Sequence, residues 1–80
     1  MIVKNLLRFL KALKPATVKE MKDFGLRDEV REVIDALGGL AVSAQYAERL
    51  SLGKDENIDN RTWVKLWTRL AVLRAALNED

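Results

Sequence analysis

The sequence predicts an all-α fold, a small bundle of four to five short helices. Apolar residues recur with the 3.6-residue period of an amphipathic helix along most of the chain, and no stretch shows convincing two-residue alternation. The periodic segments are separated by proline, glycine or polar turn residues. The 80 residues are 49% hydrophobic and 32% charged, which is the balance of one small globular domain spanning residues 1–80.

A first helix is expected over residues 2–13. Its apolar residues gather on one side, and Lys4, Arg8 and Lys11 line the other. Pro15 should end this helix, because the residue before a proline is pushed out of the α region.

A second helix should then run to about Phe24. Thr17 and Glu20 have the spacing of a capping box at its start, and Gly25 suits the left-handed position that closes it. A third helix is expected over residues 28–37, with Gly38 and Gly39 ending it.

A fourth helix is expected over residues 41–51. An alternative is a wing hairpin over residues 40–52, although that stretch lacks a turn signal at its middle. Residues 53–60 are polar and predict a loop, with Asp59 or Asn60 capping the final helix.

Two tryptophans lie four residues apart in the final helix. Trp63 and Trp67 share one arc with the leucines of that helix, whereas Arg61, Lys65 and Arg69 fall on the opposite side. A platform that stacks nucleic-acid bases needs aromatic rings and cations on one exposed surface. The indoles are therefore predicted to pack in the core. Arg74 falls inside the apolar arc, so it should either extend to solvent at the helix end or pair with an acidic group.

The composition argues against most enzyme chemistry. The chain has no cysteine and no histidine, which excludes nucleophile pairs that use either residue and the usual zinc sites. Asp55, Asn57 and Asp59 have the spacing of a calcium loop, but Asn60 and Leu66 occupy positions that need glycine and glutamate. We expect no enzyme activity, no cofactor and no metal. The lack of a long apolar run argues against a membrane partner and predicts a cytoplasmic protein.

Charge is unevenly distributed along the chain, although the net charge is only +2. The two ends are basic and the middle is acidic. One candidate surface for a partner or nucleic acid comprises the cations of the first and last helices: Lys4, Arg8, Lys11, Lys14, Arg61, Lys65 and Arg69. The other candidate is an acidic face for a protein partner: Asp28, Glu29, Glu32 and Asp35.

The stretch TVKEMKDFGLRDEVREVIDAL resembles the core of helix-turn-helix DNA-binding domains. The resemblance implies a nucleic-acid-binding regulator. The helix in the recognition position, however, would present Asp28, Glu29, Glu32 and Asp35 to DNA, and carboxylates repel phosphates.

Two hypotheses follow. The first is a non-enzymatic adaptor, inhibitor or assembly subunit that acts through protein–protein contacts. The alternative is a helix-turn-helix-like regulator that contacts nucleic acid through the basic face of its first helix. A chain this short buries only about 60 to 65% of its unfolded surface, so its core is thin and a homodimer is a further hypothesis.

Overall fold

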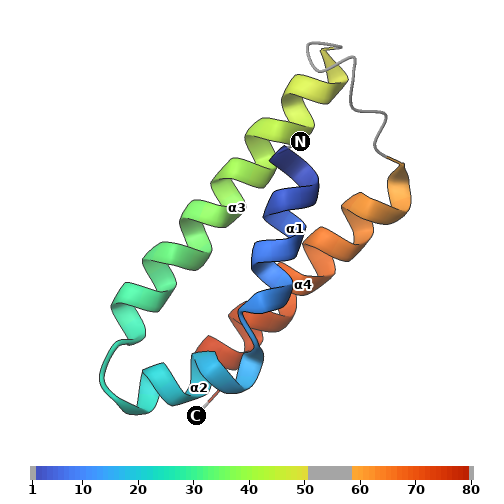
Figure 1. Ribbon diagram of the computed structural model, residues 1–80. Helices are drawn as coiled ribbons and strands as arrows, with labels where there is room; N and C mark the ends of the chain where they lie inside the picture. The colour runs from blue at the N-terminus through green and yellow to red at the C-terminus, as the bar shows by residue number, and fades with distance from the viewer. Residues whose placement is uncertain (1, 51–58, 80) are drawn as a thin grey trace.

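The computed structural model describes residues 2–50 and 59–79, which form four α-helices and no strand (Figure 1). The helices are α1 (Ile2–Ala12), α2 (Pro15–Asp23), α3 (Arg27–Arg49) and α4 (Asn60–Asn78). The prediction of an all-helical bundle is therefore confirmed for the described residues.

Both α3 and α4 contact each of the other three helices, and the contacts of α4 are the more extensive. Figure 1 shows α3 running antiparallel to α1 and α4, with α2 crossing the end of the bundle where the C-terminus lies. The result is elongated, with principal extents of 42 × 19 × 16 Å.

The core is made by the predicted apolar faces. The largest fully buried side chains come from all four helices: Leu10, Val18, Ile34, Leu66, Leu70 and Leu73. Trp63 is only 5% exposed and Trp67 is half-buried against the same cluster. The prediction that the tryptophans pack in the core is confirmed, fully for Trp63 and in part for Trp67.

The start of α2 differs from the predicted capping box. Pro15 occupies the first turn of α2 and Lys14 is the N-cap residue, without a side-chain cap. A proline is well suited to this place, since the first turn needs no amide donor and the fixed φ of proline is already helical. Thr17 and Glu20 therefore lie inside the helix, and the prediction that they cap it is wrong. The predicted left-handed turn is confirmed, since Gly25 has φ 84°.

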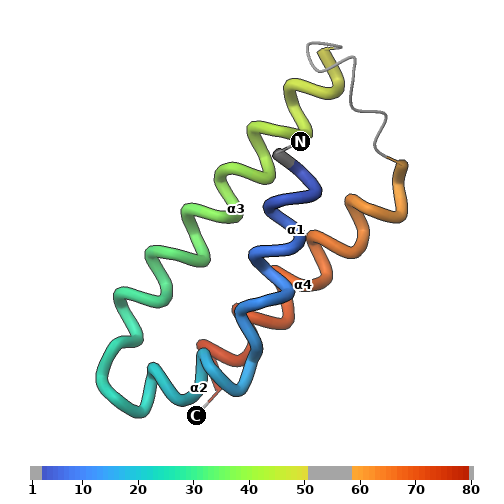
Figure 2. The backbone as a smooth tube through the Cα atoms, in the orientation of Figure 1, coloured from blue at the N-terminus to red at the C-terminus, as the bar shows by residue number. Residues whose placement is uncertain are grey.

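The paired glycines do not end a helix. Figure 2 shows the backbone of α3 continuing without a break from Arg27 to Arg49. The predicted end at Gly38 and Gly39 is therefore wrong, and the expected third and fourth helices are one. The hairpin alternative is wrong for residues 40–50, while residues 51 and 52 lie outside the described part of the chain.

Packing explains why a glycine lies within α3. Gly38 is buried, and a Cβ atom at that position would lie 2.7 Å from Nη2 of Arg74. The absence of a side chain lets the Arg74 guanidinium cross α3 and reach Asp35, with Nη2 3.9 Å from Oδ1. This contact is the acidic pairing that the sequence analysis proposed for Arg74. A helix tolerates the propensity cost of glycine where tertiary packing requires it.

Candidate functional site

The basic residues of α1 lie beside the first turn of α4. Lys4, Arg8 and Lys11 of α1, with Leu7, line a shallow depression of about 370 Å³ that Thr62 of α4 closes. Two cations of α4 are exposed near Thr62. Arg61 directly precedes Thr62 in sequence, and Lys65 lies one turn after it. We call Lys4, Arg8, Lys11, Arg61 and Lys65 the basic surface.

The remaining two predicted cations, Arg69 and Lys14, lie outside this surface. Arg69 is half-buried and donates three hydrogen bonds to carbonyl oxygens at the end of α1. Its Nε–Leu10 O distance is 3.0 Å, and its Nη2 lies 3.1 Å from the carbonyl oxygens of Lys11 and Leu13. The last carbonyls of a helix have no partner within it, so Arg69 is a side-chain cap for α1. Lys14 is exposed in the turn between α1 and α2.

The predicted acidic face lies on the first half of α3. Asp28, Glu29, Glu32 and Asp35 are all exposed, as predicted from the sequence pattern. Asp28, Glu32 and Asp35 share one side of α3, and Glu29 lies further round the helix. Asp35 pairs with Arg74, whereas Glu29 lines an apolar pocket on another side of α3.

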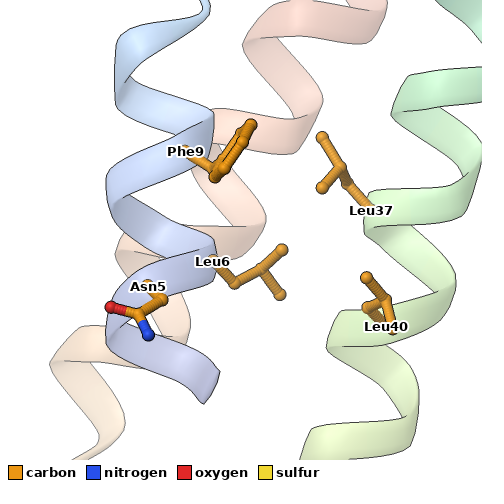
Figure 3. Close-up of a pocket in the computed structure, with 5 residues that line it drawn as sticks. All are labelled: Asn5, Leu6, Phe9, Leu37 and Leu40. Carbon is orange, nitrogen blue, oxygen red and sulfur yellow. The ribbon is translucent and has the colours of Figure 1, made fainter. Parts of the chain in front are cut away.

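An apolar pocket opens between α1 and α3. It has a volume of about 320 Å³ and is lined by Asn5, Leu6, Phe9, Leu37 and Leu40. Figure 3 shows Leu6 and Phe9 of α1 facing Leu37 and Leu40 of α3, while the amide of Asn5 points away from α3. Leu6 is buried and forms the floor, while Phe9 is 71% exposed and Leu40 is 56% exposed.

A second apolar pocket lies on the same side of α3, toward its N-terminal end. It has a volume of about 290 Å³ and is lined by Leu13, Met21, Leu26, Glu29, Val30 and Val33. Leu13 follows the end of α1 and Met21 belongs to α2, so this pocket lies between α2 and α3. Val33 lies one turn before Leu37, so both pockets border the same face of α3. We call their combined apolar lining the apolar trough: Leu6, Phe9, Leu13, Met21, Leu26, Val30, Val33, Leu37 and Leu40.

Sequence reasoning missed this trough. The periodicity placed Val33 on the buried face of its helix, yet Val33 is 52% exposed. The available signal was the width of the apolar arc, because Leu26, Val33, Leu37 and Leu40 extend it beyond what one neighbouring helix can cover. A helical wheel cannot show which part of a wide arc a neighbour covers.

The described residues contain no group of three or more His, Cys, Asp or Glu arranged to hold a metal. Of the residues with calcium-loop spacing, Asp55 and Asn57 lie outside the described part of the chain, and Asp59 is the N-cap of α4. Nor does any helix in the described part of the chain combine the length and apolar character needed to span a membrane.

Among the described residues, two carboxyl groups have lowered pKa values, and both belong to structural contacts. The Asp59 carboxylate accepts hydrogen bonds from the backbone amide and the hydroxyl of Thr62, at 3.0 and 2.9 Å, and these bonds lower its pKa. The Glu79 carboxylate lies 2.9 Å from Nζ of Lys19, and the hydrogen bond and charge of that lysine lower its pKa.

Comparison with known proteins gives no assignment: no protein-family model, curated protein or solved structure matches the chain.

Proposed function

We propose that this chain is a small non-enzymatic binding protein that acts through protein–protein contacts and docks its partner in the apolar trough. The observation that supports the proposal is the pair of pockets along one face of α3, one against α1 and one against α2, whose lining is apolar except for Asn5 and Glu29. Exposed apolar side chains that gather on one face are typical of interaction sites.

The dimensions of the trough suit a helix. Leu26, the N-cap of α3, and Leu40 lie at its two ends, 14 residues apart, which corresponds to about 21 Å of helix. Apolar anchors of an amphipathic helix, spaced three and four residues apart, would fit along this face of α3 over about four turns. Burying such anchors is favourable by roughly 25 cal/mol for each Å² of apolar surface removed from water.

A photocrosslinking amino acid at position 40 tests this proposal in cells of the native host. The matched control is the same substitution at Val42, which is 58% exposed against 56% for Leu40 but lies two residues further along α3 and so outside the trough. The proposal expects a discrete protein adduct from position 40 and none from position 42. Equal adduct patterns at both positions, or no protein adduct at position 40, would contradict it.

The alternative function is nucleic-acid binding, and one observation favours it. The cations Lys4, Arg8 and Lys11 of α1 line a depression beside Thr62 of α4, whose sequence neighbour Arg61 is exposed and basic, and such cations could neutralise phosphates. The helix-turn-helix-like hypothesis would place α3 in the recognition position after α2 and its Gly25 turn, where Asp28, Glu29 and Glu32 are exposed. The basic surface is therefore the proposed contact, and α3 is not.

Titration of duplex DNA with salt distinguishes this alternative. A basic surface that neutralises phosphates would give an affinity that falls steeply as salt rises, and reversing the charges of Lys4, Arg8 and Lys11 would abolish binding. Reversing the charge of Arg49, an exposed cation at the far end of α3, is the control. Absence of binding at low salt would exclude the alternative.

A further inference from the structure

We draw no further inference here: the strongest candidate, the apolar face of α3 that borders the pockets against α1 and α2, belongs to the site already described, and nothing in the structure shows what covers it.

Discussion

At the scale of single residues, two polar side chains of α4 tie helices together from the edge of the core. Arg69 donates to three carbonyl oxygens at the end of α1, and Nε1 of Trp63 donates to a carboxylate oxygen of Glu48 on α3 at 2.6 Å. These contacts give hydrogen-bond partners to the indole N–H of Trp63 and to the carbonyl oxygens at the end of α1, which packing partly shields from water. They give α4 a fixed position against both neighbouring helices.

Replacing Arg69 should destabilise the fold. Arg69→Met keeps the long apolar stem but leaves the carbonyl oxygens of Leu10, Lys11 and Leu13 without the guanidinium donor, so the free energy of unfolding should fall by about 2 to 3 kcal/mol. The free energy of unfolding of Arg69→Lys should lie between those of the wild type and Arg69→Met, because an ammonium group cannot reproduce the planar fork of donors of a guanidinium.

Urea denaturation measures this effect, and Lys65→Met is the control. Lys65 is an exposed cation one turn before Arg69 and makes no such contact with the described residues, so its replacement should change stability by no more than about 0.5 kcal/mol. Equal stabilities for the Arg69→Met and Lys65→Met proteins would show that the cap contributes nothing.

At the scale of secondary-structure elements, α3 is the helix that most departs from its local signals. It runs through two consecutive glycines, yet residues on both sides of that pair pack into the core, through buried Val30, Ile34 and Ala41. Helix propensity is a weak local preference, and burial of a long apolar face outweighs it.

The two glycines should respond differently to replacement by alanine. Nothing lies within 4 Å of a Cβ atom added at Gly39, so Gly39→Ala should raise the free energy of unfolding by about 1 kcal/mol through helix propensity alone. A Cβ atom at Gly38 would displace the Arg74 guanidinium from its place near Asp35. Gly38→Ala should therefore raise the free energy of unfolding by less than Gly39→Ala does.

Thermal or urea unfolding of both variants checks this order. Gly25→Ala is a reference for backbone strain, because Gly25 has φ 84° and alanine there should be destabilising by about 1 kcal/mol. If Gly38→Ala raised the free energy of unfolding by more than Gly39→Ala, the role assigned to the Arg74 contact would be contradicted.

At the scale of the whole molecule, α4 makes the most extensive contacts with the other helices. The two carboxylates with lowered pKa values, Asp59 and Glu79, lie at the start and just beyond the end of this helix. Asp59 caps the first turn, and Glu79 pairs with Lys19 of α2. Protonation should therefore loosen both ends of α4.

The pH dependence of stability follows from the direction of these shifts. Both pKa values are lower in the folded chain than their ordinary values of 3.8 for Asp59 and 4.5 for Glu79. The unfolded chain thus binds protons first, so the stabilisation is fully present above the ordinary values and is lost as pH falls through the lowered ones. Both groups are exposed, so each effect should be small.

Thermal melts from about pH 7 to about pH 2 measure this loss. Asp59→Asn keeps a good N-cap acceptor that does not titrate, so this variant should lose less stability in acid than the wild type. Glu79→Gln is the corresponding change at the other end of α4. An acid transition identical to that of the wild type in both variants would show that other carboxyl groups control it.

Part of the candidate site was predictable from sequence. The exposure of Lys4, Arg8, Arg61 and Lys65 follows from helical spacing, and so does the burial of Trp63. The placement of the α1 cations beside the first turn of α4 was not predictable, because it depends on how two helices about 50 residues apart in sequence pack. Arg69 has the same spacing as the exposed cations and differs only through the carbonyl oxygens that α1 places beside it.

The sequence by itself determined the helical class, the leucine and tryptophan core face of α4, the Gly25 turn and the separation of basic from acidic segments. These features follow from periodicity and backbone preference within a few residues of each position. Only the tertiary structure decided that α3 continues through Gly38 and Gly39, that Arg69 caps α1, and that apolar pockets stay open where α3 faces α1 and α2. Each of these depends on which helix covers which part of a face, and contacts between segments distant in sequence decide that coverage.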